Sequence, residues 1–177
     1  VMQGLAADVL VLSGGVSAGD LDLVPAIFAA CGVERVFHKV RLKPGKPIWF
    51  GRLDRGAGLP PAVVFGLPGN PASSLVCFEL FVRPALAILA GLPRDRWHLP
   101  RQRGVLTAAA KAAVDRPVYL PCRITRVAGH LDVAPLPWTG SSDLVGLAVA
   151  DGLVALAAGG PADPGTAVEV LELSLIH

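Results

Sequence analysis

The sequence is poor in several residue types, and each scarcity excludes a class of protein. It holds only three cysteines in 177 residues, Cys31, Cys77 and Cys122, which are far apart and form no C-x-x-C pair. A disulfide framework and a zinc site are therefore not expected. The four histidines also lack a metal-binding spacing such as H-E-x-x-H. We expect reduced thiols in a cytoplasmic protein.

Charge and long apolar runs are scarce as well. Charged residues make up 17% of the chain and the net charge is +2, so no global field favours nucleic acid. The most apolar late run, residues 144–160, is broken by Asp151 and several glycines, and no signal peptide is recognisable. We expect no nucleic acid and no membrane as partners. The hydrophobic content of 53% still suffices for a sizeable core.

The common nucleotide-binding motifs are also missing, since neither G-x-x-x-x-G-K-[ST] nor G-x-G-x-x-G occurs. What the chain does have is a concentration of positive charge. Residues 35–55 hold seven lysines and arginines and one acid, Asp54. If residues 34–43 form one strand, Lys39, Arg41 and Lys43 share a face, and the turn at Pro44-Gly45 returns Lys46 to them. Such a cluster favours an anionic ligand, although a solvated edge strand is an equal alternative.

The second informative stretch is residues 66–74, GLPGNPASS, which follows a short apolar run. Asn70 is a favoured N-cap and Pro71 a favoured first helical residue. Free N–H groups at such a helix start suit a phosphate, whereas a capped helix without a ligand is the simpler reading.

A third loop, residues 13–22 (SGGVSAGDLD), joins a strand at 8–12 to a helix at 21–31. Its backbone N–H groups and hydroxyls suit an anion or a polar ring substituent. Asp20 is expected to cap the helix. Asp22 either caps as well, or holds Mg²⁺ or positions a substrate.

Periodicity divides the chain into two parts. Strands at 8–12, 34–43, 47–52 and 62–66 and helices at 21–31 and 71–91 predict an α/β domain over 1–92, with Pro84 kinking the last helix. Its missing first strand and helix suggest an N-terminal truncation. A linker at 93–103 precedes a small all-β domain at 104–177. Its strands are expected at 104–109, 118–127, 131–136, 152–157 and 166–173, with a short helix at 142–150.

Three motifs, SGGVSAGDLD at 13–22, KPGKP at 43–47 and GLPGNPAS at 66–73, together resemble the molybdopterin molybdenumtransferase family, which includes the E domain of gephyrin. The match continues through residues 78–86 (FELFVRPAL). The resemblance implies a molybdopterin-binding three-layer α/β domain followed by a barrel-like β domain. It also implies molybdenum cofactor biosynthesis, in which molybdate is inserted into adenylylated molybdopterin with release of AMP. Mg²⁺ would assist, and the full-length protein would be a homodimer.

Carried over by motif, the resemblance gives Asp22, Lys39, Lys43 and Lys46 catalytic roles, with Asp22 also as the metal ligand. Gly140-Ser141-Ser142 either meets a ligand or caps the last helix, and capping is the expected role. The predicted substrate-binding residues are Ser13, Gly14, Gly15, Ser17, Gly19, Pro68, Gly69, Asn70, Pro71, Ser73 and Ser141.

The chain departs from the family pattern at two places. An earlier Thr-Gly-Asp-Glu segment is absent, and Tyr119 is followed by Leu120 and Pro121 where the family has an arginine two residues after an aromatic. Three alternatives stay open. They are a non-catalytic binding or scaffold module of the same fold, a molybdopterin adenylyltransferase-like domain, and a generic α/β phosphate-binding enzyme. The β domain at 104–177 argues against the adenylyltransferase.

Overall fold

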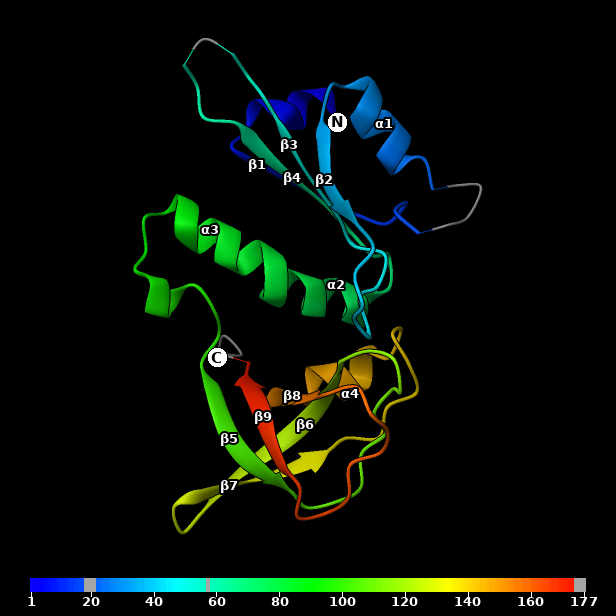
Figure 1. Cartoon of the computed structure of the whole chain (residues 1–177), viewed down its shortest axis with the longest axis vertical. Helices are drawn as coiled ribbons and strands as arrows, with labels where there is room; N and C mark the ends of the chain where they lie inside the picture. The colour runs from blue at the N-terminus through cyan, green and yellow to red at the C-terminus, as the bar shows by residue number, and fades with distance from the viewer. Residues whose placement is uncertain (18–21, 57, 174–177) are drawn as a thin grey trace.

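The first half of the chain is built on a four-stranded sheet (Figure 1). The computed structural model describes residues 1–17, 22–56 and 58–173. The strand order is β1 (Val9–Ser13), β4 (Ala62–Leu67), β3 (Trp49–Leu53) and β2 (Glu34–His38). β1 and β4 are parallel, whereas the other neighbours are antiparallel. Because β1 and β4 lie side by side and parallel, the loops that follow them emerge at the same edge.

Helices cover both faces of this sheet. The 3₁₀ helix η1 (Met2–Ala6) and helix α1 (Val24–Ala30) lie on one face (Figure 1). Phe28 of α1 stacks on Trp49 there with ring centroids 4.7 Å apart. The predicted helix at 21–31 is shorter in its described part, Val24–Ala30, and Leu23 and Ile27 are exposed.

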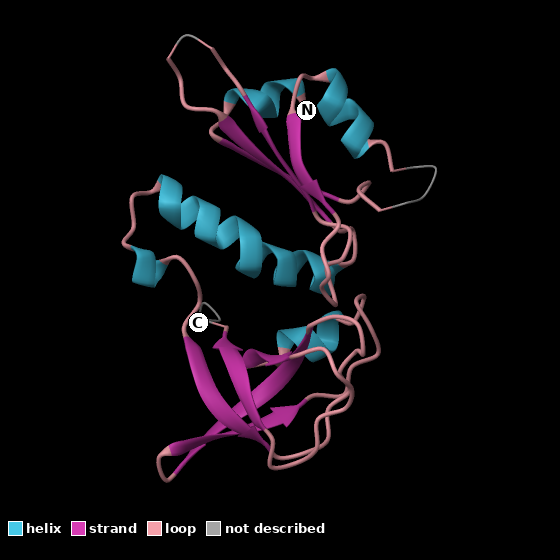
Figure 2. Cartoon of the chain, viewed as in Figure 1, coloured by secondary structure: helices cyan, strands magenta, loops and turns pink. Residues whose placement is uncertain are grey.

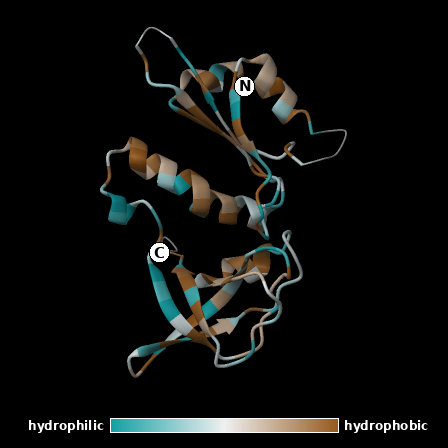
Figure 3. Cartoon of the chain, viewed as in Figure 1, coloured by the Kyte–Doolittle hydropathy of each residue, from teal (hydrophilic) through white to brown (hydrophobic). Residues whose placement is uncertain are grey.

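The opposite face is covered by one long helical segment. It consists of α2 (Pro71–Cys77), the π-helical turn η2 (Phe78–Val82) and α3 (Arg83–Leu89). The π turn lies just before Pro84, which cannot donate an i→i−4 hydrogen bond, so the predicted distortion at this proline is confirmed. By length and composition this segment of 19 residues passes a test for a membrane span, as buried core helices also do. Figure 3 shows the hydrophobic character of the segment; Val76, Cys77 and Val82 are buried, whereas Leu86, Ile88 and Leu89 are exposed.

The second half forms a closed barrel of five strands, with the order β5-β7-β6-β8-β9 (Figure 2). The short η3 (Arg94–Arg96) lies in the connection between the domains. Val118, Val133, Val154 and Val170 point into the barrel interior, as strand alternation requires. The predicted α/β domain followed by a β barrel is thus confirmed. The elements are β5 (Arg101–Leu106), β6 (Val118–Val127), β7 (His130–Pro135), α4 (Leu144–Ala148), β8 (Gly152–Leu156) and β9 (Ala167–Glu172).

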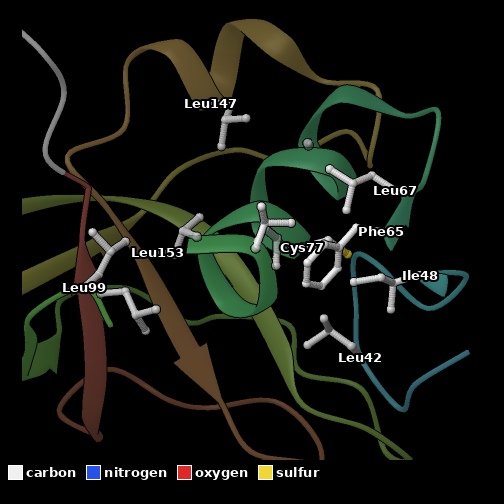
Figure 4. Close-up of a cluster of buried hydrophobic side chains, with 12 residues drawn as sticks. Leu42, Ile48, Phe65, Leu67, Cys77, Leu99, Leu147 and Leu153 are labelled. Atoms are coloured by element: carbon white, nitrogen blue, oxygen red, sulfur yellow. The ribbon is translucent and has the colours of Figure 1, made fainter. Parts of the chain in front are cut away.

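The largest buried cluster does not belong to either domain alone (Figure 4). Phe65 and Leu67 come from β4, and Val76 and Cys77 from α2. From the barrel side, α4, β8 and β9 contribute residues to the same cluster. These residues are Leu147, Leu153 and Leu171. We call this the shared core, because it fixes the two domains to each other through the long helical segment.

One predicted strand is wrong in its length. The strand expected over 34–43 ends at His38, because Lys39 has a φ of +67° and so leaves the extended conformation. Lys39, Arg41 and Lys43 therefore do not share one strand face. The strand expected at 104–109 begins three residues earlier, at Arg101, and the other barrel strands agree with their predicted ranges to within one residue at each end.

The shared core allows a test of how strongly the domains depend on each other. Leu153 is fully buried, so Leu153→Ala should lower the free energy of unfolding by about 2–5 kcal/mol. Leu144→Ala removes the same atoms from a side chain that is 55% exposed and should have little effect. Urea denaturation of both variants measures the difference, and equal losses would contradict the assignment of Leu153 to the core.

Candidate functional site

A cleft of about 1310 Å³ opens between the α/β domain and the barrel. Its α/β wall is formed by the three loops that the sequence analysis singled out. Most of the predicted site residues line it. These are Gly15, Ser17, Asp22, Lys43, Lys46, Pro68, Gly69, Asn70, Ser73 and Ser141.

The loops after β1 and β4 touch at the edge of the sheet. The Gly14 N–H donates to the Leu67 carbonyl oxygen at 2.9 Å, and the Ser13 hydroxyl donates to the Pro68 carbonyl oxygen at 3.2 Å. A Cβ atom at Gly69 would lie 3.4 Å from the Gly14 Cα, so glycine at both positions keeps the loops close. Ser13 and Gly14 thus support the cleft from behind and do not line it.

The loop between β2 and β3 carries Lys43 and Lys46, and we call it the lysine loop. Its backbone is hydrogen-bonded to the barrel. The Lys43 N–H donates to the Pro117 carbonyl oxygen at 3.0 Å, and the Tyr119 N–H donates to the Lys43 carbonyl oxygen at 2.8 Å. The Arg41 guanidinium donates to the Asp115 carbonyl oxygen, with Nε at 3.2 Å. The hydrogen bonds of Lys43 to the barrel use only its backbone, so its side chain is available to the cleft. Lys43 and Lys46 both line the cleft.

Below this loop lies a buried thiol. Gly45 has a φ of +116° and is buried, and a Cβ atom there would lie 2.6 Å from the Cys77 Sγ. Burial raises the pKa of the Cys77 thiol to about 12, so this sulfur stays protonated and serves packing. The loop therefore requires glycine at this position for both its conformation and its fit.

Asn70 joins the two walls. It occupies the N-cap position of α2, but its side chain makes no capping hydrogen bond. Its Nδ2 instead donates to the Ser141 Oγ at 2.7 Å, while the Ala72 N–H donates to the Ser141 carbonyl oxygen at 3.2 Å. The prediction that Asn70 caps with its side chain is wrong, because the Ser141 carbonyl oxygen of the barrel loop accepts from an N–H of the first helical turn, that of Ala72, in place of the Asn70 side chain.

The expected capping role of Ser141 is also wrong, because Asp143 is the N-cap of α4. Its carboxylate accepts from the Gly146 N–H at 2.9 Å and from the N–H and hydroxyl of Thr139 at 3.2 and 3.0 Å. These hydrogen bonds, led by that of Gly146, lower the pKa of Asp143 below its ordinary value. The carboxylate thereby holds the loop at 139–143 in place, and Ser141 with it.

Three predicted residues stand apart from this assembly. Lys39 and Pro71 are exposed and are not among the lining residues, whereas Gly19, like Asp20, lies outside the described residues. Asp22 lines the cleft. Within the described ranges, no group of three or more His, Cys, Asp or Glu side chains is placed to hold a metal ion.

The barrel wall contains residues that the sequence analysis did not assign to the site. Arg116 forms an ion pair of 2.8 Å with Asp115, and its hydrogen bond lowers the pKa of that carboxyl. No local motif marks these residues, since they come from separate segments and meet only in the folded barrel. The added lining residues include Lys111, Asp115, Arg116, Leu120, Leu136, Pro137 and Trp138.

Comparison with known proteins agrees with this architecture. A family model described as "Probable molybdopterin binding domain" matches residues 1–88, and one described as the MoeA C-terminal region (domain IV) matches residues 103–173. A molybdopterin molybdenumtransferase of Synechocystis is 33% identical over 149 residues, which is 84% of this chain and 34% of the relative. The chain belongs to the molybdopterin molybdenumtransferase family.

Other molybdopterin molybdenumtransferases and their structures extend the comparison. One from Mycobacterium tuberculosis is 43% identical over 110 residues, covering 58% of this chain and 25% of the relative. A gephyrin of Dictyostelium discoideum is 35% identical over 132 residues, covering 67% of this chain and 18% of the relative. A solved Pyrococcus molybdopterin biosynthesis MoeA protein has a TM-score of 0.71 at 28% identity, covering 94% of this chain and 37% of that one. The chain thus spans about a third or less of these relatives.

The Asp143 cap predicts a pH dependence of stability. A carboxyl whose pKa is lowered in the folded state stabilises that state above its unfolded pKa, and the effect is lost as the pH falls through the folded pKa. Asp143→Asn should therefore be less stable than the parent at pH 7, and the difference should shrink as the solution becomes more acidic than the ordinary aspartate range.

Urea denaturation of both proteins at pH 7, 5 and 3 measures this difference. Asp95→Asn is the control, because it removes the same charge from an exposed side chain that has no hydrogen-bond partner in the described part of the chain. A stability difference for Asp143→Asn that is constant across this pH range would show that the charge of the cap plays no part.

Proposed function

We propose that this chain forms the reaction cleft in which molybdate is inserted into adenylylated molybdopterin with release of AMP. The observation that carries the proposal is the placement of Lys43 and Lys46. Both project from one loop into the cleft, and the loop is fixed by the barrel on one side and by Cys77 on the other. The family membership of both domains supports the same reaction.

The charges of the cleft suit this chemistry. The proposed substrate carries a phosphoanhydride, and the second reactant is an oxyanion, so both need cations and N–H donors. Lysine ammonium groups held in advance of the reaction stabilise negative charge that develops on the leaving phosphate. Ser17, Ser73 and Asn70 add hydrogen-bonding groups on the same wall. The role of Lys39 remains a prediction from the resemblance, since it lies outside the lining.

We propose Asp22 as the protein ligand of a Mg²⁺ ion. The described residues offer the ion no cage of carboxylates, and Asp22 and Asp115 are the acids among those that line the cleft. Such a site fits Mg²⁺, which is commonly held by one or two carboxylates together with substrate phosphates and waters. The ion would neutralise phosphate charge when bound. Asp22 would hold it, and Lys43 and Lys46 would contact the remaining anionic oxygens.

The alternatives differ from this proposal in what they need from the barrel. A molybdopterin adenylyltransferase-like domain would need only the α/β part, whereas here the barrel domain supplies about half of the residues that line the cleft. The similarity to a gephyrin keeps a scaffold role open for this fold. We further propose that the full-length protein is a cytoplasmic homodimer, which light scattering and fractionation would test.

Removing a cleft lysine should weaken anion binding and transfer together. We expect Lys43→Ala to bind adenylylated molybdopterin roughly ten- to hundredfold more weakly, as for the loss of a charged hydrogen bond, and to release less AMP on addition of molybdate. Titration of the purified chain with and without Mg²⁺, followed by an assay for AMP, measures both effects.

Arg35→Ala is the matched control, because it removes one positive charge from the same basic segment at an exposed position on β2, away from the cleft. It should bind and react as the parent does. Unchanged binding and AMP release in Lys43→Ala would remove this lysine from the site, and equal losses in both variants would show that only the overall charge matters.

A further inference from the structure

The two walls of the cleft differ in chemical character. On the α/β wall, the lining includes the cations of Lys43 and Lys46 and the carboxylate of Asp22. On the barrel wall, an apolar strip of three consecutive residues, Leu136, Pro137 and Trp138, follows β7, and the same wall also carries Lys111, Asp115 and Arg116. The cleft thus offers cations from one wall and an aromatic, apolar surface from the other.

Trp138 is the one aromatic side chain among the described residues that line the cleft, and it is held in place. Part of it packs against the shared core, so it is only partly exposed. Its loop is fixed on both sides. The Leu136 N–H donates to the Pro121 carbonyl oxygen at 2.9 Å, and Thr139 is held by the Asp143 carboxylate. A tryptophan fixed in this way loses little freedom when a ligand stacks on it.

The indole N–H of Trp138 is also available. It donates to no residue in the described part of the chain, and no buried polar atom there lacks a partner, so the group reaches solvent. The N–H of Trp97 provides the contrast, because it donates to the Leu92 carbonyl oxygen at 2.9 Å outside the cleft. Trp138 thus combines an apolar ring with a solvent-accessible donor in the lining of the cleft.

We propose that Trp138 binds the flat nitrogen heterocycle of the substrate, while the phosphate lies against Lys43 and Lys46 on the opposite wall. This inference rests on the proposed function, because that substrate supplies two such rings, the pterin and the adenine. Both are planar, carry hydrogen-bond acceptors and are linked to phosphate, so the same surface suits either ring. Stacking on a tryptophan does not depend on the exact pattern of ring atoms.

The test separates the ring from the phosphate and one ring from the other. The chain and its variants are titrated by calorimetry with AMP, with a phosphorylated pterin and with inorganic pyrophosphate. Trp138→Ala should weaken binding of at least one ring-bearing ligand roughly ten- to hundredfold and leave pyrophosphate unchanged, and Trp138→Phe should restore most of the loss. The ligand that responds identifies the ring on the platform, and a response of both assigns the surface to either ring.

Two controls decide between a binding role and a structural one. Trp97→Phe removes one of the two tryptophans outside the cleft, the other being the buried Trp49, and should leave all three affinities unchanged. In this variant ring binding should still quench the fluorescence of Trp138. Lys43→Ala should weaken the binding of pyrophosphate. If it does not while Trp138→Ala still loses ring binding, the proposed lysine function fails and the ring platform stands.

Three results would overturn the inference. One is that Trp138→Ala loses as much affinity for pyrophosphate as for the ring-bearing ligands. The same loss in Trp138→Phe would indicate that the loop has collapsed. Another is unchanged binding of both ring ligands in Trp138→Ala. The third is that neither AMP nor the pterin binds the folded parent chain at millimolar concentration.

Discussion

The backbone pairing of Lys43 with the barrel segment from Pro117 to Tyr119 is the contact on which the cleft depends. It anchors the lysine loop to a barrel segment that follows it by more than 70 residues in sequence. Gly45 allows the same loop to pack closely against Cys77 of α2. Leu42 and Ile48, which flank Gly45 in the sequence, belong to the shared core. The positions of the two cleft lysines are therefore set by the sheet, the long helix and the barrel together.

The shared core explains why this pairing holds. The helical segment from Pro71 to Leu89 covers one face of the sheet and, through α2, also contacts α4 of the barrel (Figure 1). Leu147, Leu153 and Leu171 are buried against it, so the two domains cannot separate without exposing apolar surface to water. The hydrogen bond between Asn70 and Ser141 adds a polar contact between the two walls of the cleft.

Sequence reasoning could identify the elements whose pattern is local. The apolar runs bounded by glycine and proline gave the strands of the sheet, and the alternating runs gave the barrel strands nearly to the residue. The strand expected to continue to Lys43 failed at Lys39, because nothing in the alternation reveals a positive φ at a lysine. Asn70 and Ser141 were each expected to cap a helix, and both form instead a contact across 71 residues, which no local pattern contains.

The same limit explains which part of the cleft could be predicted. The α/β wall consists of three short loops with distinctive glycines, prolines and lysines, each visible as a motif. The barrel wall combines residues from β6, from the segment at 109–116 and from the loop after β7, and these segments meet only because the barrel closes. Its apolar strip, Leu136 to Trp138, is a short loop segment without a recognisable motif, so only the folded structure shows that it lines the same cleft as the lysines.

The difference between the two walls also suggests why a barrel accompanies this α/β domain. Loops rich in glycine, serine and lysine can bind an anion by themselves, but they offer little apolar surface to an attached ring. The barrel supplies that surface and, in the same contact, fixes the lysine loop through its backbone. The interface between the two domains thus both positions the lysine loop and adds the apolar surface of the cleft. It serves the binding of a ligand as well as the stability of the fold.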